Sequence, residues 1–413
     1  MTPSWSDMVR SFGRIGLMSF GGPAAQIALM HSELVDRRGW LAEDTFLRGL
    51  GFCTLLPGPE AMQLATFAGW RLRGTAGGLL AGLLFVLPGA VVMIALAAAY
   101  LSFGRLAPVE AAFLGIKAAV LAVVAQALWK LRAKALNGPL ALSVAVAAFV
   151  ALFFLSVPFW AVLGAALLIG AARPEGEVAP VEAPVKPRTV QTIVLWLLIW
   201  WVPLLAVLAV APGSVPAQAG LFFSWLATVS FGGAYAVLAA LAQTAVETHG
   251  WLSPGQMVDG LGLAETTPGP LILVTVFTGW LGGAQASGWA MALGTALVTL
   301  WATFAPCFLW IFAGAPHLER LTAQPRLRGA LSMVSAAVAG VIANLSLWFA
   351  IHVLFDDVTN PAFGPPVPVF ATANVSAWAL AALGGVWLLV LRRPLLEGLA
   401  VCAAGGLIFW AVL

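Results

Sequence analysis

Long apolar segments with almost no charge are the feature that most constrains this sequence. Charged residues make up 9% of its 413 residues and apolar residues 61%. Soluble domains carry about 25% charged residues, because charged side chains cover much of a soluble surface. The same apolar content excludes a disordered chain. We therefore predict an all-α polytopic membrane protein, since each crossing of a bilayer needs about 20 predominantly apolar residues.

The chain carries an internal duplication. Ser-Phe-Gly-Gly at residues 19–22 recurs at 230–233, and Pro-Gly-Pro at 57–59 recurs at 268–270, both at an offset of 211. Further matches follow in the same order over about a hundred residues. Isolated matches of such short motifs would be weak, but collinear matches over this length indicate two homologous halves.

A charged, proline-rich stretch separates the two halves. We predict a first transmembrane repeat at 1–172, a linker with one linker helix at 173–215, and a second transmembrane repeat at 216–413. Each repeat has about six transmembrane units. One unit in each repeat is broken at Pro-Gly-Pro, because proline cannot continue the hydrogen bonding of a helix.

Basic residues in the loops predict the orientation. If the broken unit at 43–71 crosses the membrane and the N-terminus is inside, only Arg37, Arg38 and Arg105 lie outside. If that unit is instead a re-entrant hairpin, the basic residues divide about evenly between the two sides. The positive-inside rule favours the crossing arrangement. That arrangement also gives an odd number of crossings before the second repeat, so we predict inverted repeats, an architecture that recurs in transporters.

The two Pro-Gly-Pro breaks are the strongest candidates for a binding site. Pro59 is placed to begin a new half-helix, whose first amides belong to Glu60, Ala61 and Met62. In the second repeat the corresponding amides are those of residues 271–273. Helix N-termini bind anions through such amides. Brought together by pseudo-symmetry, the two breaks would form an anion cradle; the alternative is a pair of kinks that only shapes helix packing.

Glycines and intramembrane polar residues extend this candidate site. Gly-Gly-Pro at 21–23 breaks the first helix, whereas its counterpart at 232–234 lacks the proline. Arg48 and Lys117 are the cationic candidates. The predicted substrate-binding residues are Gly21, Gly22, Pro23, Arg48, Pro57, Gly58, Pro59, Glu60, Ala61, Gln63, Lys117, Gly232, Gly233, Glu265, Thr266, Thr267, Pro268, Gly269 and Pro270.

Each of these residues also has a structural explanation. The glycines would serve close helix packing, and Glu60 would cap its half-helix. Arg48 would pair with Glu60 or Asp44, and Lys117 would reach the membrane surface with its long side chain. The polar set of Thr266, Thr267, Gln63, Gln126 and Asn344 would line a path or make hydrogen bonds between helices.

The sequence predicts no enzyme and no cofactor. The four histidines and three cysteines lack metal-ligand spacing, so no metal site is predicted. The motifs of nucleotide-binding loops, nucleophile elbows and zinc proteases are missing from the sequence, and the carboxylates form no recognisable catalytic set. The small net charge of +3 gives no reason to expect nucleic acid as a partner.

The motifs at 19–25, 56–66 and 264–271 resemble the signatures of the chromate ion transporter family. The resemblance covers both halves and is typical of the long, two-domain members. It implies a multi-pass protein of the bacterial inner membrane, a secondary transporter that exports chromate and confers chromate resistance. Sulfate, a near-isostere of chromate, is the expected competitor.

The resemblance leaves other functions and assemblies open. One alternative is a carrier for sulfate or another small anion on the same scaffold. The other is a non-transporting membrane enzyme or receptor. The lipid bilayer is the predicted surrounding, and the oligomeric state is open, a homodimer included.

Overall fold

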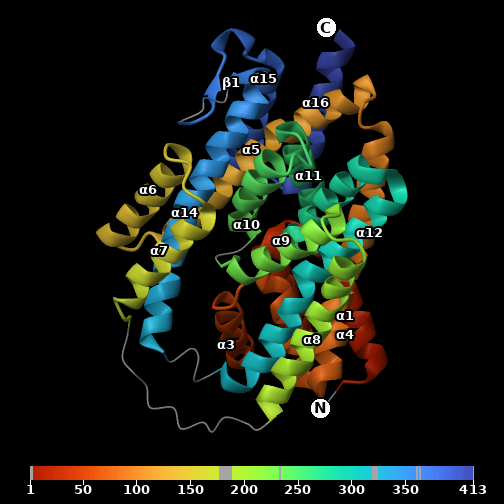
Figure 1. The fold of residues 1–413 in the computed structure, drawn as a ribbon, viewed down its shortest axis with the longest axis vertical. Coiled ribbons are helices and arrows are strands. Elements are labelled where there is room, and N and C mark those ends of the chain that lie inside the picture. The colour runs from red at the N-terminus through yellow and green to blue at the C-terminus, as the bar shows by residue number, and fades with distance from the viewer. Residues whose placement is uncertain are drawn as a thin grey trace. The chain divides into compact units, whose positions relative to one another are not determined.

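The computed structural model describes residues 3–175, 188–231, 234–318, 324–359, 361 and 364–412, and they are almost wholly helical (Figure 1). The elements of the first half are α1 (Trp5–Met18), α2 (Gly22–His31), η1 (Ser32–Arg37), α3 (Glu43–Thr54), α4 (Glu60–Phe103), α5 (Ala107–Ala135), α6 (Pro139–Phe153) and α7 (Phe159–Ala171). The linker helix is α8 (Arg188–Val210).

The second half begins with α9 (Val215–Val229), α10 (Ala234–Leu241), η2 (Ala242–Thr248), α11 (Pro254–Thr266), η3 (Leu271–Leu273), α12 (Val274–Gly314) and η4 (Ala315–His317). It continues with α14 (Pro325–Leu354), β1 (Val358–Thr359), β2 (Val367–Pro368), η5 (Phe370–Thr372), α15 (Val375–Gly385), η6 (Val386–Val390) and α16 (Leu395–Val412). The two short strands pair antiparallel, with Val358 opposite Pro368.

Six helices in the described part of the chain are long and apolar enough to cross a membrane. They are Glu60–Phe103, Ala107–Arg132, Thr189–Val210, Leu271–His317, Pro325–Leu354 and Leu395–Val412. Large apolar side chains on these helices lie on the surface, Val91 and Ile408 among them, each about two-thirds exposed. An apolar exterior of this kind is stable in lipid and not in water. The prediction of an all-α polytopic membrane protein is confirmed.

The chain folds into two compact units, and each unit takes segments from both halves. The first unit contains Met1–Ala97, Glu175–Val237 and Ala264–Arg328, and the second contains Ala98–Pro174, Leu238–Leu263 and Gly329–Leu413. The compact units therefore do not coincide with the repeats predicted from the sequence. Both Pro-Gly-Pro breaks belong to the first unit.

The first helix, which the sequence predicts to break at 21–23, is a hairpin rather than a single crossing. Gly21 and Gly22 both have positive φ, at 83° and 79°, and Pro23 follows them in the first turn of α2. The chain reverses there: the hydroxyl of Ser11 on α1 lies 3.3 Å from the carboxylate of Glu33 on η1, which two helices in line could not allow. The prediction of a break at 21–23 is confirmed, and the prediction that this unit crosses the membrane is wrong.

The broken unit at 43–71 also doubles back. The backbone of Gly49 on α3 lies against the ring of Phe67 on α4, and the rings of Phe52 and Phe67 are 6.5 Å apart between centroids. Two collinear half-helices would hold residues 49 and 67 roughly 25 Å apart, at 1.5 Å per residue. The unit is therefore a hairpin with Pro-Gly-Pro at its tip, and the crossing arrangement predicted from the loop charges is wrong.

Two further reversals divide the longest helices. In α4 the backbone is non-helical at Arg73 and Gly74, and Gly69 lies against the carbonyl of Gly77. In α12 the backbone is non-helical at Ser287 and Gly288, and Gly283 before that point lies against the carbonyl of Met291 after it. Both long helices are therefore divided by a reversal of the chain at these positions.

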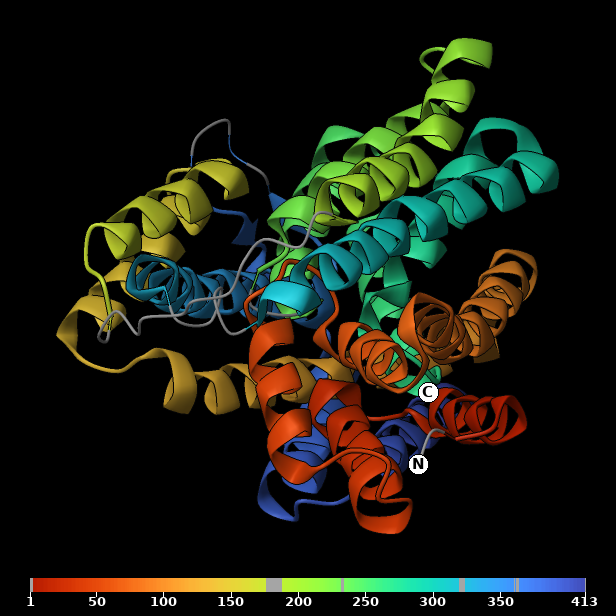
Figure 2. The ribbon, with the colours of Figure 1, turned by 90° about the horizontal axis from the view of Figure 1, so that it is seen from below.

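The first unit is built on α8, α9 and α12, which run side by side (Figure 1, Figure 2). Trp196 of α8 stacks on Phe308 of α12, with ring centroids 5.4 Å apart. Trp200 donates its indole N–H to Ser224 of α9 over 3.1 Å, and Trp301 donates to the carbonyl of Trp200 over the same distance. Aromatic area and satisfied indole groups thus join the linker helix to the second repeat.

The second unit is built on α5, which packs against α15 and α16. Gly115 on α5 lies against the backbone carbonyl of Cys402 on α16, and Gly406 lies against the carbonyl of Ala111. Small residues at both positions let the two backbones approach closely, as in many membrane helix pairs. Gly340 on α14 makes the same kind of contact with the carbonyl of Ala145 on α6.

Candidate functional site

The two Pro-Gly-Pro breaks are joined to the opposite repeats by reciprocal hydrogen bonds. The amide of Gly58 donates to the carbonyl of Ser230 over 3.0 Å, and the amide of Gly269 donates to the carbonyl of Ser19 over 2.8 Å. Gly58 and Gly269, like Ser19 and Ser230, are equivalent positions of the duplication. Each break therefore meets the Ser-Phe-Gly-Gly segment of the other repeat. Both glycines have positive φ, 114° and 95°, a conformation that side chains disfavour.

Two buried glutamines support the carbonyl groups of the breaks. Gln63 donates to the carbonyl of Pro57 over 2.6 Å, and Gln26 donates to the carbonyl of Gly269 over 2.6 Å. Both side chains are at most 1% exposed. In each, the Oε1 atom is buried and has no hydrogen-bond partner in the described part of the chain. A buried acceptor without a partner is costly, so a further donor at either oxygen would be stabilising.

The half-helices that follow the breaks differ in their first turn. α4 begins as an α-helix, with the amide of Gln63 bonded to the carbonyl of Pro59 over 3.1 Å. Helix geometry leaves the amides of Ala61 and Met62 without an acceptor inside α4. In the second repeat the amide of Leu273 donates to the carbonyl of Pro270 over 2.9 Å. The prediction that Leu273 offers an open amide is wrong, because this half-helix starts with a 3₁₀ turn.

The other predicted residues of this region lie around the breaks. All six residues of the two Pro-Gly-Pro segments are buried. Glu265 and Thr267 are 3% and 2% exposed, while Glu60 and Thr266 are half-buried. Gly21, Gly22 and Pro23 form the tip of the α1–α2 hairpin beside Ser19. Gly232 and Gly233 lie outside the described residues.

Both cationic candidates make ion pairs. Arg48 lies on α3, pairs with Asp44 one turn before it, and has a side chain that is 53% exposed. That pairing is one of the structural explanations considered for it. Lys117 belongs to the second unit, where its Nζ atom is 3.3 Å from a carboxylate oxygen of Asp259. The sequence analysis missed Asp259, although an acid within an apolar segment of the second repeat was a signal that could have found it.

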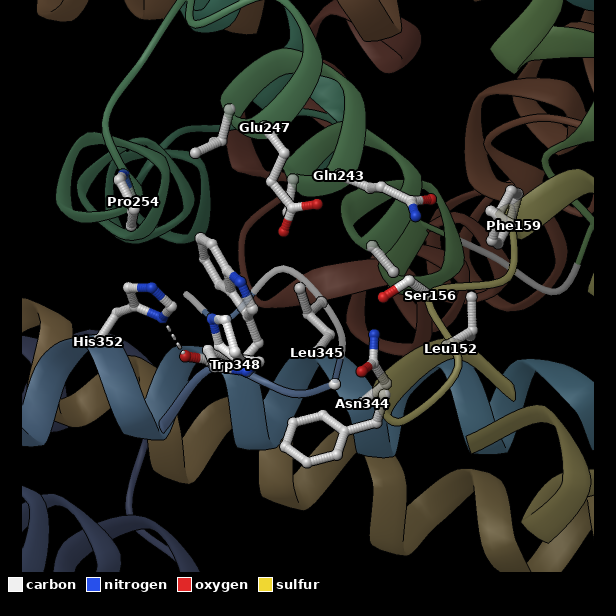
Figure 3. Close-up of a pocket in the computed structure, with 17 residues that line it drawn as sticks. Leu152, Ser156, Phe159, Gln243, Glu247, Pro254, Asn344, Leu345, Trp348 and His352 are labelled. Carbon is white, nitrogen blue, oxygen red and sulfur yellow. Dashed lines mark hydrogen bonds between the residues drawn. The ribbon is translucent and has the colours of Figure 1, made fainter. Parts of the chain in front are cut away.

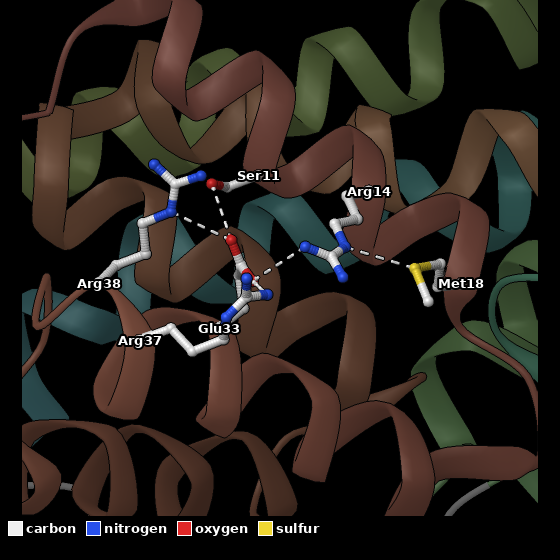
Figure 4. Close-up of polar contacts among 6 residues, drawn as sticks. All are labelled: Ser11, Arg14, Met18, Glu33, Arg37 and Arg38. Carbon is white, nitrogen blue, oxygen red and sulfur yellow. Dashed lines mark hydrogen bonds and ion pairs between the residues drawn. The ribbon is translucent and has the colours of Figure 1, made fainter.

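Glu33 is a second residue that sequence analysis missed. Its carboxylate is 4% exposed and receives hydrogen bonds from Arg37 at 2.8 Å and Arg38 at 3.1 Å (Figure 4). Arg14 approaches from α1 at 4.0 Å. One buried carboxylate thus holds three arginines at the open end of the α1–α2 hairpin, opposite its tip. The cluster fixes the hairpin whose tip carries Ser19.

A cavity of about 490 Å³ lies within the second unit. Glu247 and Gln243 point into it from η2, and Asn344 and Trp348 from α14 (Figure 3). His352 lies at its edge, with Nδ1 at 2.8 Å from the carbonyl of Trp348. Glu247 is the one charged side chain among its lining residues, and its negative charge opposes a dianion. Asn344, one of the polar-path candidates, lines this cavity. Gln126 accepts a 3.0 Å hydrogen bond from Lys130 on the exposed part of α5.

Comparison with known proteins gives the family. The profile of the family described as Chromate transporter matches residues 6–171 and again 217–410. The "Probable chromate transport protein" of Synechococcus elongatus is 29% identical over 99% of this chain and 96% of its own length. The "Chromate transport protein" of Pseudomonas aeruginosa is 30% identical over 91% of this chain and 88% of its own length.

A third relative, the "Chromate transport protein" of Cupriavidus metallidurans, is 30% identical over 85% of this chain and 84% of its own length. No solved structure matches this chain. The family profile spans nearly all of both halves, and the motifs at the paired breaks lie inside the matched stretches. The chain belongs to the chromate transporter family.

Proposed function

We propose that this chain is a secondary carrier that exports chromate across the inner membrane of a bacterium and so confers chromate resistance. The reciprocal hydrogen bonds between each break and the Ser-Phe-Gly-Gly segment of the other repeat carry the proposal, because they hold Pro-Gly-Pro segments from both repeats within one compact unit. The names of the relatives support chromate as substrate. Broken helices in paired repeats are a common way to build a transport site.

We propose that the anion binds at the first turns after the breaks. The amides of Ala61 and Met62 point away from the helix at its positive dipole end, which suits a tetrahedral dianion. Irregular backbone at membrane depth is tolerated where protein or a water-filled cavity satisfies it. The hydroxyls of Thr266 and Thr267, which directly precede the second break in the sequence, are further candidate donors. Glu60 and Glu265 are the acids that such an anion would meet.

The membrane potential is sufficient to drive export. One charge that crosses 100 mV changes its free energy by about 2.3 kcal/mol. A dianion leaving an inside-negative cell therefore gains about 4.6 kcal/mol, which supports a gradient of roughly three orders of magnitude. Uptake of the same dianion would need co-transported cations.

The hairpins strengthen the case for inverted repeats. If the N-terminus is inside and the broken units double back in both repeats, Arg105 is the one basic loop residue left outside. The linker helix α8 then still brings the second repeat in with the opposite orientation. The hairpins therefore fit the positive-inside rule better than the crossing units predicted from the sequence.

Introduced cysteines test this orientation. The three native cysteines are buried and form no disulfide, so an impermeant maleimide reacts only with the added thiols. We expect Ala42→Cys and Thr75→Cys, both at exposed positions, to be labelled from the cytoplasmic side alone. Labelling of Ala42→Cys from the periplasm would mean that the first unit crosses the membrane. Labelling of Thr75→Cys from the periplasm would contradict the arrangement of the second hairpin.

Chromate accumulation in cells with and without the protein tests the function. We expect cells that make the protein to accumulate less chromate and to survive higher concentrations. In vesicles, a panel of oxyanions separates chromate from sulfate, which is the second candidate on the same scaffold. Equal accumulation in both strains, with the protein present in the membrane, would contradict chromate export. Turnover of a compound without net flux would point to a membrane enzyme instead.

A further inference from the structure

A buried carboxylate in the second unit has no part in the site described above. Asp259 lies on α11 and is 3% exposed. Its Oδ2 atom is 3.3 Å from Nζ of Lys117 on α5. The same oxygen accepts a 2.8 Å hydrogen bond from the hydroxyl of Tyr100, near the end of α4. Three segments that are far apart in the sequence thus meet at one carboxylate oxygen.

Glycines on α11 bring this carboxylate to α5. Gly255, Asp259 and Gly262 are spaced by four and three residues, so they share one face of the helix. Gly262 lies against Ile116, and a Cβ atom at Gly255 would be 3.5 Å from Nζ of Lys117. Small residues on both sides of Asp259 allow the close approach of the two helices. The packing therefore places the acid against the lysine.

The other oxygen of Asp259 is unsatisfied. Its Oδ1 atom is buried and has no hydrogen-bond partner within the residues that the structure describes. An ionised carboxylate is costly when one of its oxygens is buried without a hydrogen-bond donor, and a proton bound at that oxygen removes the cost. Lys117 would then lose its partner. Its side chain is 23% exposed, so the ammonium group can turn to water.

Two more charged groups act on this cluster through space. Glu110 on α5 acts on Asp259, and its negative charge favours the neutral acid. Arg105, in the turn after α4, acts on Tyr100. The charges around Asp259 thus oppose one another, with Lys117 favouring the carboxylate and Glu110 favouring the protonated form. Balanced surroundings of this kind suit a group that gains and loses a proton.

We propose that Asp259 is a proton-binding site that alternates between an ion pair with Lys117 and a neutral carboxyl, and that this protonation is coupled to anion transport. The coupling rests on the proposed transport function, whereas the proton site itself does not. Buried acids in membrane proteins commonly serve as proton relays. The competing explanation is a fixed ion pair that only stabilises the packing of α11 on α5.

Proteoliposomes that contain a trapped pH-sensitive dye test the coupling. We expect an imposed chromate gradient to move protons in wild-type vesicles. In Asp259→Asn this movement should fall by about tenfold or more, while exchange of chromate for chromate continues. The exposed Asp357→Asn is the matched control and should behave as the wild type. Wild-type chromate exchange without proton movement, or undiminished proton movement in Asp259→Asn, would overturn the coupling.

Two variants that keep the carboxylate test the proposal even if Asp259→Asn fails to fold. Lys117→Met removes the positive partner, and we expect the midpoint of proton-coupled flux to move up by about 1–2 pH units. Tyr100→Phe removes one donor and should move it the same way by about half a unit. A fixed ion pair predicts no such graded shift, so unchanged midpoints would overturn the proposal.

An infrared measurement separates this inference from the proposed function. Protonated carboxyl groups have a distinct C=O stretch, and we expect a pH-dependent band of this kind in the wild type. Asp259→Asn should lack it, and Asp357→Asn should keep it. If wild-type vesicles fail to exchange chromate, the proposed function fails while the band still supports the proton site. If the band is missing from the wild type or persists in Asp259→Asn, the proton site is overturned.

Discussion

The two Pro-Gly-Pro breaks have the same backbone contact and different side-chain support. At the first break the supporting amide is local, since Gln63 lies six residues after the carbonyl of Pro57 that it holds. At the second break the support comes from the other repeat, because Gln26 reaches the carbonyl of Gly269 from α2. Gln26 also lies 3.3 Å from the carbonyl of Ser19, so it joins both partners of the backbone contact.

The surroundings of the two glycines differ as well. A Cβ atom at Gly58 would lie 2.9 Å from Nε2 of Gln63 and 3.1 Å from Sγ of Cys307. At Gly269 it would meet Leu273 at 3.2 Å and the carbonyl of Phe85 at 3.4 Å. The first break is thus bordered by polar and polarisable side chains, and the second by apolar side chain and backbone. The duplication gives the two breaks the same backbone contact, but the side chains around them differ.

The largest expected effect is that of a bulky residue at either glycine. Gly58→Leu and Gly269→Leu place a side chain at positive φ in a buried segment, so we expect both to abolish chromate flux. Flux into vesicles, with membrane insertion checked separately, measures this. Normal insertion together with wild-type flux in both variants would mean that the anion site lies elsewhere and that the breaks are packing features.

Alanine at the same positions sharpens the comparison. A non-glycine residue at positive φ costs about 1–3 kcal/mol wherever it occurs. Gly288→Ala measures that cost alone, because its φ is 73° and nothing lies within 4 Å of its Cβ position. We expect Gly58→Ala to lose more flux than Gly269→Ala, since its Cβ atom is more crowded. The reverse order would show that the second break is the more sensitive to a side chain at its glycine.

Loss of the supporting glutamines should have the next largest effect. Gln26→Leu and Gln63→Leu each leave a buried carbonyl without its donor, which costs about 1–3 kcal/mol. Thermal unfolding in detergent measures the loss, with Gln218→Leu as a control because its hydrogen bond is exposed. We expect Gln26→Leu to loosen the α1–α2 hairpin and to expose Arg37 to trypsin. If Gln63→Leu gives the same trypsin cleavage, the two supports are not as different as the contacts imply.

A smaller effect is expected at the open end of that hairpin. Glu33→Gln removes the charge that holds three arginines, and we expect a loss of about 1–2 kcal/mol because the arginines themselves are partly exposed. The second break should suffer more than the first, since Ser19 is at the tip of this hairpin. The control is Glu43→Gln, whose side chain is 58% exposed and pairs with His31. Equal unfolding temperatures for the two variants would contradict a supporting role for Glu33.

The smallest effect is expected at Arg48. Its pair with Asp44 is exposed on both sides, and exposed pairs contribute little to stability. Loss of that pair in Arg48→Gln should therefore lower the unfolding temperature only a little. If this residue supplies a compensating charge for the anion, the variant will still bind chromate more weakly than the surface variant Arg393→Gln. Identical affinities for the two variants would remove Arg48 from the site.

The sequence predicts where the chain breaks and fails to predict the direction it takes afterwards. Proline and paired glycines forbid a continuous helix at 21–23 and 57–59, and the structure has breaks at both. The angle at a break depends on contacts with distant residues. Arg14 pairs with Glu33, and Phe67 packs on Gly49, and neither contact follows from local pattern. The crossing arrangement was wrong for that reason.

The same limit applies to the candidate site. Position in the duplication identified Gly58 and Gly269, because the motif repeats around them. It gave no sign of Gln26, Glu33 or Asp259, since none of these has a counterpart of the same type in the other half. A residue whose role depends on contact with a distant segment can be recognised only once the fold is known. Lys117 was noticed, but its partner was not.

The reciprocal bonds at the breaks have a consequence for how the protein is made. Gly58 needs the carbonyl of Ser230, which the ribosome adds about 170 residues later. At 5–20 residues per second the first break waits roughly 10–30 s for its acceptor. During that time the nascent first half must keep an unsatisfied tip out of the lipid core. Insertion of this protein therefore needs both halves together, and a chain truncated before Ser230 should be a target for quality-control proteases.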